Sequence, residues 1–504
     1  MNKLSGKRVL ILQQRNWGKI IGRYLAHKLH EEGALLAALT FKSTTHDLIV
    51  NQPNAKYELI VNNDIVMSCP REFLGNNTYS LEEICRELGI DTIWPIVSSL
   101  RNHTKSYWEK YYYSFRQNVS DEGIIDYVSA VYKYIKIFFD EFRPDVILSP
   151  NFVSLPHIML KLYSQKRNVP MFAITDVKVQ KSYIFSHSYN DDSGLFFEHL
   201  EKLDNDQIES PHREEARQYI KEFRENFKAP DYATYLNPRS KSIVQKVRST
   251  LSPWNQVLHW YLGHHEQPIE SIGINVDYRP PKILLRDYFA HKSHTRSAER
   301  FNYYPLENIK KFIYFPLQFQ PEAAIDVLAT RFSNQIETGR QIAMSLPGDY
   351  TLVVKEHPAM IGLRTPSYLE KVARTPNIKL IDFRIPSERV LRGAEIVIGP
   401  GSTTIMEAAM IKKPAIQLGN LGTTKILPNV FRHTDFTTLP AKIKEVLSVK
   451  LDDSKYERKL ENYVAAAYDT RLKSDYLAAY SGKKLEMREI LWQDYKKELE
   501  RVLS

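Results

Sequence analysis

The chain has 504 residues, of which 43% are apolar and 25% are charged, and its formal net charge is +10. This length and composition exclude both a single small domain and a disordered chain, while the two cysteines form no metal or disulfide pattern and suggest a reducing cytoplasm. No apolar run reaches the roughly 18–20 residues that span a bilayer, and no basic tract suggests a nucleic-acid partner, so the positive charge indicates either a solvated surface or attraction to the inner face of a membrane.

The first 177 residues alternate between strand and helix patterns. We expect strands at residues 8–12, 35–41, 144–150 and 170–174, and helices at residues 19–32, 124–142 and 157–165. Short connections between alternating strands and helices are typical of a parallel, doubly wound sheet. Residues 1–177 are therefore predicted to form a Rossmann-like lobe.

Residues 178–304 interrupt this alternation. They are rich in charged and aromatic residues, with helical patterns at 212–227 and 241–262, and we interpret them as a mainly helical insertion or linker. Aromatic residues at 254–260 stand beside basic ones, a pattern that suits either membrane contact or packing of this helix against the main lobes.

The alternation resumes at residue 305. We expect strands at residues 311–317, 351–355, 378–382, 395–399 and 414–418, and helices at residues 334–346, 366–374, 387–392 and 404–411. Residues 305–437 are thus a second Rossmann-like lobe. Residues 438–504 read as a helical tail, and we expect it to cross back and brace the first lobe.

A glycine-rich loop follows the predicted strand at 395–399. Its candidate ligand contacts are Gly399, Gly401, Ser402, Thr403 and Thr404. Glycines let the backbone approach a ligand closely, and the N-terminus of the next helix offers unpaired N–H groups that suit a phosphate. In a doubly wound sheet such a loop lies at the carboxyl ends of the strands, where ligands bind.

Two alternatives remain open for this loop. Thr404 and Glu407 have the spacing of a capping box, which would make the loop a plain strand–helix turn. Glu407 could instead accept hydrogen bonds from the ribose hydroxyls of a nucleotide.

A second candidate site is the sequence Lys-Glu-His-Pro at the end of the strand at 351–355. Because a residue before proline is kept out of the helical region, His357 should stay extended next to Pro358. Its imidazole could donate to a phosphate or shift a proton near neutral pH, and Lys355 could stabilise a leaving phosphate. The alternative is a purely structural histidine.

A third candidate is the loop after the strand at 311–317. Gln318 and Gln320 could orient sugar hydroxyls or a base edge, and Glu322 could act as a general acid or base if burial raised its pKa. Each of these residues could equally have a simple capping or loop role. We find no metal-binding motif, and we expect a metal-independent enzyme that relies on helix dipoles and basic side chains.

These three motifs resemble the bacterial capsule polysaccharide biosynthesis family, which includes the Kdo transferases of capsule assembly. The resemblance rests on Tyr-Phe-Pro-Leu-Gln-Phe-Gln-Pro-Glu (314–322), Val-Val-Lys-Glu-His-Pro (353–358) with Gly362 and Arg364, and Gly-Ser-Thr-Thr-Ile-Met-Glu-Ala-Ala (401–409) with Lys-Lys-Pro-Ala-Ile-Gln-Leu-Gly (412–419). It covers residues 305–420, whereas the first lobe is similar only in its architecture.

The resemblance implies a GT-B fold, with two facing Rossmann-like lobes and a nucleotide-sugar donor bound mainly by the second. His357 and Pro358 would contact the donor's phosphate, and Ser402, Thr403 and Glu407 its phosphate and ribose. The donor would be linked to CMP or UDP, with no other cofactor.

The same resemblance places a glycan or glycolipid acceptor against the first lobe. The residues expected beside it are Gln13, Gln14, Arg15, Trp17 and Asn151. Three alternatives to glycosyl transfer stay open: a nucleotide-sugar epimerase, a polyol-phosphate transferase, and a non-catalytic protein of capsule assembly.

Overall fold

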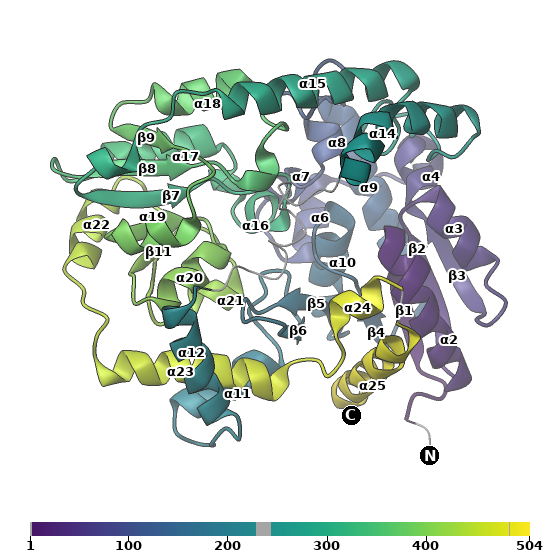
Figure 1. Cartoon of the computed structure of the whole chain (residues 1–504). Coiled ribbons are helices and arrows are strands. Elements are labelled where there is room, and N and C mark those ends of the chain that lie inside the picture. The colour runs from purple at the N-terminus through teal and green to yellow at the C-terminus, as the bar shows by residue number, and fades with distance from the viewer. Residues whose placement is uncertain (1–2, 228–242, 483) are drawn as a thin grey trace.

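A computed structural model of the chain describes residues 3–227, 243–482 and 484–504. It has two lobes, each built around its own six-stranded sheet with helices on both faces (Figure 1). This is the two-lobed α/β architecture of the GT-B fold, as predicted.

The first sheet has the strand order β3-β2-β1-β4-β5-β6. Its strands are β1 (Arg8–Gln13), β2 (Leu35–Thr40), β3 (Tyr57–Asn62), β4 (Val146–Leu148), β5 (Met171–Asp176) and β6 (Tyr183–Ser186). The first five are parallel, and β6 runs antiparallel to β5. The order changes direction between β1 and β4, so the switch point of this lobe lies at the carboxyl ends of these two strands.

The second sheet has the order β12-β11-β10-β7-β8-β9 and is parallel throughout. Its strands are β7 (Phe312–Pro316), β8 (Thr351–Lys355), β9 (Ile378–Ile381), β10 (Ile396–Gly399), β11 (Ala415–Gln417) and β12 (Val430–Arg432). Here the order changes direction between β7 and β10, which places the switch point at their carboxyl ends.

Helices cover both sheets. The first lobe has α1 (Arg15–Trp17), α2 (Arg23–Glu31), α3 (Ser43–Val50), α4 (Asn63–Ser68), α5 (Pro70–Leu74), α6 (Leu81–Leu88), α7 (Trp94–Val97), α8 (Arg101–Thr104), α9 (Asp121–Ile137) and α10 (Leu155–Gln165). The second has α16 (Ala323–Asp326), α17 (Gln335–Met344), α18 (Pro366–Ala373), α19 (Ser387–Gly393), α20 (Thr403–Met410) and α21 (Gly422–Lys425). The helix expected at 19–32 starts within a π-helical turn at Gly18–Gly22, which follows α1, and it continues as α2.

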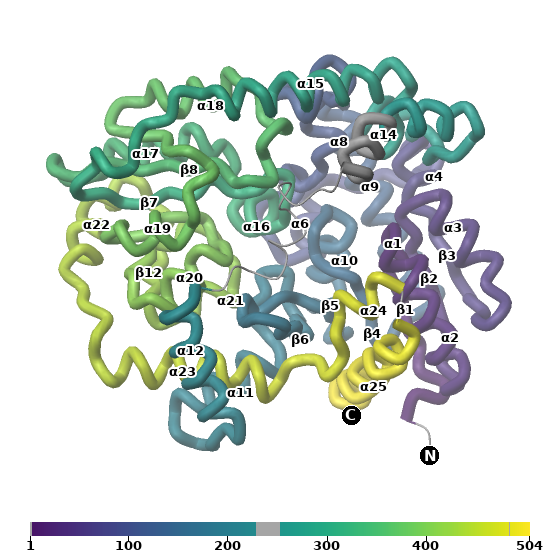
Figure 2. The backbone as a smooth tube through the Cα atoms, in the orientation of Figure 1, coloured from purple at the N-terminus to yellow at the C-terminus, as the bar shows by residue number. Residues whose placement is uncertain are grey.

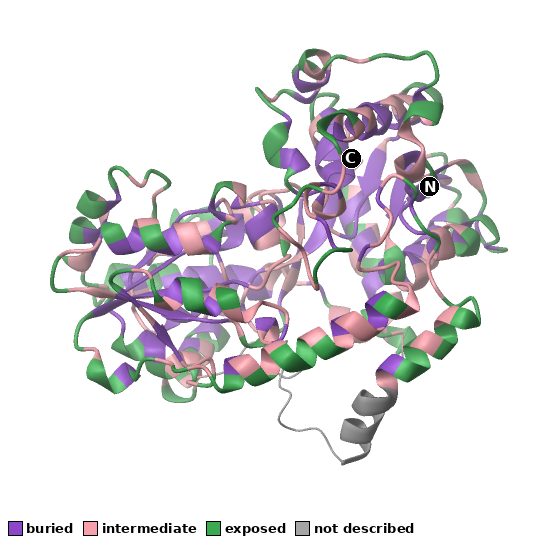
Figure 3. Cartoon of the chain, turned by 90° about the horizontal axis from the view of Figure 1, so that it is seen from above, coloured by how far each residue is buried: buried purple, intermediate pink, exposed green. Residues whose placement is uncertain are grey.

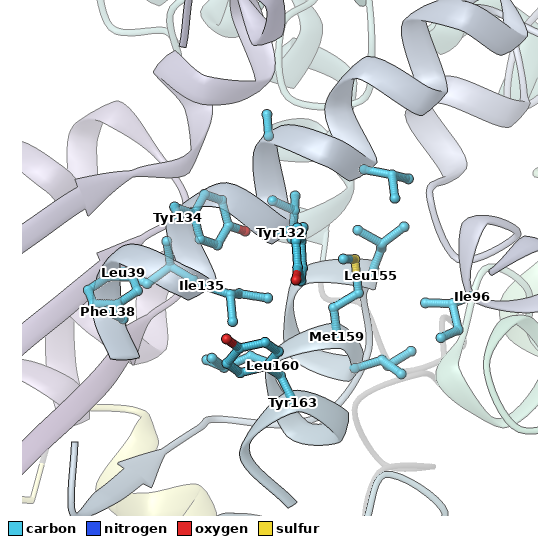
Figure 4. Close-up of a cluster of buried hydrophobic side chains, with 14 of the residues drawn as sticks. Leu39, Ile96, Tyr132, Tyr134, Ile135, Phe138, Leu155, Met159, Leu160 and Tyr163 are labelled. Atoms are coloured by element: carbon cyan, nitrogen blue, oxygen red, sulfur yellow. The ribbon is translucent and has the colours of Figure 1, made fainter. Parts of the chain in front are cut away.

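The core of the first lobe forms where α9 and α10 cover one face of its sheet. Tyr132 and Ile135 of α9 pack with Met159 and Leu160 of α10, and Leu39 of β2 belongs to the same cluster (Figure 4). Most positions of both helices are buried, and the apolar surface that they remove from water ties the two helices to the sheet.

Residues 178–304 do not form one separate body. Strand β6 completes the first sheet, while α11 (Leu195–Asp204) and α12 (Arg213–Glu225) share the buried cluster of the second lobe. Helix α14 (Ile243–Tyr261) packs beside α15 (Pro281–Glu299), which runs over the top of the molecule toward α18 (Figure 1). The short edge strands β3, β6 and β12 were not expected from the sequence.

Of the two alternatives for residues 254–260, the structure bears on packing, and membrane contact stays a prediction. Helix α14 packs on α15, yet the side chains of Trp254, Leu258 and Tyr261 remain more than half exposed. Their spacing of four and three residues places them on one face of the helix. In Figure 3 exposed residues follow the outer sides of both helices.

The tail crosses from the second lobe back to the first. It comprises α22 (Leu439–Leu447), α23 (Ser454–Thr470), α24 (Tyr476–Tyr480) and α25 (Leu485–Val502). Trp492, Tyr495 and Leu499 of α25 are buried against the face of the first sheet that α2 also covers. The N- and C-terminal ends consequently lie on the same side of the first lobe (Figure 2).

Candidate functional site

The three sequence motifs meet at one edge of the second sheet. Strands β10, β7 and β8 are neighbours, and Pro316 of β7 pairs with Lys355 of β8. Because the strands are parallel, the loops that follow them emerge side by side. The switch point between β7 and β10 lies within this group, so the second lobe presents its expected ligand edge here.

The glycine-rich loop after β10 is shaped for close approach. Gly401 has φ = 138°, a conformation that favours glycine, and a Cβ there would come within 2.9 Å of the Cβ of Leu421. Ser402 is the N-cap of α20 but makes no capping hydrogen bond with its side chain. Among the residues that the structure describes, its Oγ is one of the buried polar atoms without a hydrogen-bond partner.

The capping-box alternative is wrong for this helix. Since Ser402 is the N-cap, the position that closes a capping box is Ile405 rather than Glu407. Glu407 lies a turn further on and its side chain is buried. Ligand binding by this loop stays a prediction.

Glu407 and Lys355 form a buried acid–base pair beneath this edge. Burial raises the pKa of the Glu407 carboxyl to about 8, and Lys355 opposes that rise. Burial likewise lowers the pKa of Lys355 to about 8. The Lys355 ammonium donates to the backbone oxygen of Ile385 and to Ser387 Oγ, each at 3.0 Å. Lys355 is thus built into the lobe, and its charge influences the pKa values of both Glu407 and His357.

His357 is held in one orientation. It is half-buried, and the Ala359 N–H donates to its Nδ1 at 3.2 Å. An accepting Nδ1 leaves the ring proton of the neutral imidazole on Nε2. Burial, reinforced by Lys355 and Arg364, lowers the pKa of His357 to about 4. At neutral pH this side chain is a hydrogen-bond donor through Nε2, beside an exposed Pro358.

An ion pair between Glu356 and Arg364 holds these loops together, and the sequence analysis did not predict it. The buried carboxylate of Glu356 lies 3.2 Å from Arg364 Nε, and it also accepts the His357 N–H at 2.8 Å. Arg364 Nη2 donates to the backbone oxygen of Gln318 at 2.8 Å. The Lys-Glu-His-Pro loop and the loop after β7 are therefore fixed relative to each other.

The two glutamines after β7 are engaged within the lobe. Gln318 Nε2 donates to the Pro316 oxygen at 2.9 Å, and Gln320 Nε2 donates to Asp326 at 3.0 Å. Both amides shape the loop, which favours the loop role over direct sugar contact for these nitrogen atoms.

Glu322 faces the other lobe. It precedes α16 as an N-cap without a side-chain capping bond. Although the residue is exposed, the surrounding protein removes enough water to raise its pKa. Lys178, just beyond β5, and Arg101, in α8, act in the opposite direction. The charges of residues outside the second lobe therefore influence the pKa of the Glu322 carboxyl.

Two contacts join the lobes around this position. The Tyr112 hydroxyl donates to the Gln320 oxygen at 3.1 Å, and Arg101 Nε lies 3.4 Å from Asp326. A third contact lies further along the edge, where the Gly422 N–H donates to the Asn190 oxygen at 2.7 Å. The carboxyl ends of the two sheets therefore face each other.

The expected acceptor-side residues of the first lobe separate into two groups. Gln13 and Trp17 are buried, and Trp17 belongs to the core against α25, so neither offers surface to an acceptor in this conformation. Arg15 is exposed and Gln14 half-buried. Asn151 follows β4 at the switch point, and its Oδ1 is buried without a hydrogen-bond partner among the described residues.

Within residues 3–227, 243–482 and 484–504, no three His, Cys, Asp or Glu side chains gather as a metal site. In the same ranges, none of the helices combines the length and the apolar character needed to cross a membrane.

No family model and no curated protein matches the chain. Solved structures do align with it over most of its length, but loosely. The UDP-GlcNAc 2-epimerase of Neisseria meningitidis, bound to UDP-GlcNAc, is 10% identical with a TM-score of 0.25, over 97% of this chain and 100% of its own. The β-Kdo 2,7-transferase KpsC of Thermosulfurimonas dismutans is 12% identical with a TM-score of 0.33, over 66% of this chain and 80% of its own.

A calicheamicin glycosyltransferase is similar at 13% identity and a TM-score of 0.26, over 95% of this chain and 99% of its own. Superpositions as loose as these assign no activity to this chain.

Proposed function

We propose that the chain is a GT-B glycosyltransferase that moves a sugar from a nucleotide-sugar donor to a surface glycan or glycolipid. The observation that carries the proposal is the meeting of three loops, after β10, β7 and β8, at the switch point of the second sheet. These loops carry the Ser402 hydroxyl, which has no hydrogen-bond partner among the described residues, the neutral His357 and the buried carboxyl of Glu407.

The donor's nucleotide is proposed to bind this edge. Its phosphate would lie on the N-terminus of α20, where the backbone N–H groups and Ser402 Oγ can donate to it. His357 would add a hydrogen bond from Nε2. Glu407, one turn into α20, would accept from the ribose hydroxyls, and the charge of Lys355 would favour the ionised form of that carboxyl.

The transfer step then needs a base on the acceptor side. An acceptor hydroxyl attacks the anomeric carbon, the bond from that carbon to the donor's phosphate oxygen breaks, and the nucleotide leaves with both bonding electrons. Glu322 takes the hydroxyl proton, a role favoured by its raised pKa and its position opposite Lys178. His357 and the α20 N-terminus stabilise the charge that develops on the phosphate.

A membrane-proximal acceptor fits the exposed face of α14. Trp254, Leu258 and Tyr261 could rest in the interfacial layer of a bilayer, with the acceptor presented to the first lobe. We propose on this basis that the protein works at the inner face of the membrane.

The proposal is tested by nucleotide binding. Thermal unfolding of the purified protein is measured with CMP, UDP, CDP and GDP, because a ligand at about 100 times its dissociation constant stabilises by roughly 2.7 kcal/mol. We expect a shift with CMP or UDP that is lost in Ser402→Ala and Glu407→Gln. Glu370→Gln, at an exposed position on α18, is the matched control and should keep the shift. A chain that responds to none of the four nucleotides would refute donor binding.

Incubation with the matching nucleotide sugar then separates the alternatives. Conversion of the donor to an epimer without any acceptor would indicate the epimerase. A preference for CDP and turnover of a CDP-polyol would indicate polyol-phosphate transfer. Nucleotide binding with release of free nucleotide only when acceptor is present supports glycosyl transfer.

A further inference from the structure

Two arginines stand at the ligand edge of the first lobe. Arg15 follows β1 and has φ = 45°, a left-handed conformation that costs a non-glycine residue of this size roughly 1–2 kcal/mol. Arg101 opens α8. Strain of this kind persists where the surrounding structure enforces it, and it concentrates at binding sites.

Each guanidinium group forms an ion pair with a carboxylate. Arg15 Nη2 lies 2.8 Å from Asp277, and the exposed fractions of the two side chains are 54% and 19%. Arg101 Nε lies 3.4 Å from Asp326, with exposed fractions of 28% and 4%. In both pairs the acid is the more buried partner and the cation points toward solvent. Arg101 approaches its carboxylate through Nε, so its terminal nitrogens lie farther from it.

Hydrogen bonds bring the two ion pairs near each other, because Asn118 Nδ2 donates both to the backbone oxygen of Asn102, next to Arg101, at 2.8 Å and to that of Ile272, in the segment that carries Asp277, at 3.0 Å. Burial raises the pKa of Tyr113 to about 12, while Arg101 and Arg15 both act to lower it and Asp277 and Asp326 act to raise it. Tyr113 thus lies within the electrostatic field of both the Arg15–Asp277 and the Arg101–Asp326 ion pairs. Its hydroxyl donates to Asn102 at 3.4 Å, and the neighbouring Tyr112 reaches the second lobe.

A third cation stabilises the arrangement. Lys42, which follows β2, lies 3.1 Å from Asp277 and 3.8 Å from Asp64, and only 10% of its side chain is exposed. Asp277 is therefore shared between two cations. Lys42 also has Asp64 as a partner, and Arg15, with 54% of its side chain exposed, is the exposed cation of the group.

We propose that Arg15 and Arg101 form a subsite for an anionic group, a carboxylate or a phosphate, on the acceptor. Asp277 and Asp326 are positioning residues that orient the two guanidinium groups. A planar guanidinium held in this way matches the two oxygens of a carboxylate or phosphate. The inference rests on the proposed function, because it takes the first lobe as the acceptor side, and it adds that the acceptor is an acidic glycan or a phosphorylated one.

The probes are three simple sugars that differ in charge: glucuronate, glucose 6-phosphate and neutral glucose. Binding is followed by saturation-transfer NMR on the full chain. We expect signal from one or both anionic sugars and none from glucose, with weaker binding in about 1 M salt because exposed charges are screened. Glucuronate alone indicates an acidic sugar, and glucose 6-phosphate alone a phosphorylated one.

The variant Arg15→Gln/Arg101→Gln should weaken anionic-sugar binding by about tenfold or more, since charge-assisted hydrogen bonds are lost. Asp277→Asn should weaken it less, and Arg15→Lys should restore only part of it. Arg71→Gln, which removes an exposed arginine paired with Asp126, is the matched control. Equal binding of glucose, or unchanged binding by the double variant, would overturn the subsite.

The nucleotide shift is measured on the same variants. If CMP or UDP still stabilises the double variant while no anionic sugar binds even the unaltered chain, the subsite fails and the donor lobe stands. If no nucleotide binds any form, the proposed function fails, whatever the sugars do. A double variant that has lost its nucleotide response as well is replaced by each single substitution, which tests the subsite separately.

Discussion

Replacing Glu407 by glutamine should stabilise the protein near neutral pH while weakening nucleotide binding. Glu407 is buried, and its carboxyl has a pKa of about 8 in the folded chain against an ordinary value of 4.5. A carboxyl in such a site binds its proton more tightly when folded than when unfolded. At neutral pH the folded chain must therefore keep a proton that the unfolded chain has released.

The magnitude follows from the two pKa values. Each pKa unit is worth about 1.4 kcal/mol, so this carboxyl lowers the free energy of unfolding by about 3 kcal/mol at pH 7 and by less than about 1 kcal/mol at pH 5. Because the pKa of this carboxyl is higher in the folded chain than in the unfolded chain, its contribution to the free energy of unfolding is fully present below pH 4.5 and is lost as the pH rises toward 8. Lys355, with its pKa lowered to about 8, is protonated in both states between pH 5 and 7 and adds no slope there.

Urea unfolding of Glu407→Gln and of the unaltered chain, at pH 5 and pH 7, measures this effect. The free energy of unfolding of the variant, relative to that of the unaltered chain, should rise by about 2 to 3 kcal/mol from pH 5 to pH 7. Glu370→Gln, which removes an exposed carboxylate, should show no such change. Nucleotide affinity of Glu407→Gln should fall by about tenfold, because an amide nitrogen replaces one of the two oxygens that could accept from the ribose hydroxyls.

Parallel pH profiles for Glu407→Gln and the unaltered chain would refute the reasoning. They would mean that Lys355 holds Glu407 ionised in the folded chain, as a structural ion pair. If Glu407 lowers the stability of the fold, its presence is explained by a role in ligand binding rather than by a role in folding.

Three further outcomes are expected. The ring protons of His357 should titrate in NMR near the pKa of about 4. Because this pKa is below the unfolded value of about 6.5, the contribution of the neutral ring to the free energy of unfolding is lost as the pH falls from 6.5 toward 4. A midpoint near 6.5 would show that the ring is not held as described. Arg364→Ala should lower the free energy of unfolding by about 3 to 5 kcal/mol, because it leaves the Glu356 carboxylate buried without its partner; Glu356→Gln combined with Arg364→Met should recover much of the loss, and a double variant as unstable as the single one would contradict the ion-pair role. Gly422→Ala would place a Cβ 2.0 Å from the Asp191 oxygen and should destabilise by about 1 to 3 kcal/mol through overpacking; calorimetry checks this, and an unchanged melting temperature would show that the two lobes are not in contact at Gly422.

The sequence by itself determined the alternation of strands and helices and the position of the motifs at strand ends. The strand at Thr351–Lys355 has the predicted bounds, because an apolar run with turn signals on both sides is a local property. The glycine-rich loop and the Lys-Glu-His-Pro sequence are also local, and parallel strands bring their carboxyl ends to one edge whatever the rest of the chain does.

The tertiary structure alone decided which polar groups meet. Glu356 and Arg364 pair across a loop, the charge of Lys355 on β8 lowers the pKa of Glu407 on α20, and α25 completes the core of a lobe that begins some 480 residues earlier. Trp17 looked available for an acceptor but is buried by that tail. Arg15 and Arg101 gain a common environment only when Asp277, Asp326 and Tyr113 fold around them. Burial and pairing depend on contacts between distant segments, and hydrophobic periodicity, which records only the face that a residue occupies, carries no information about the partner it finds there.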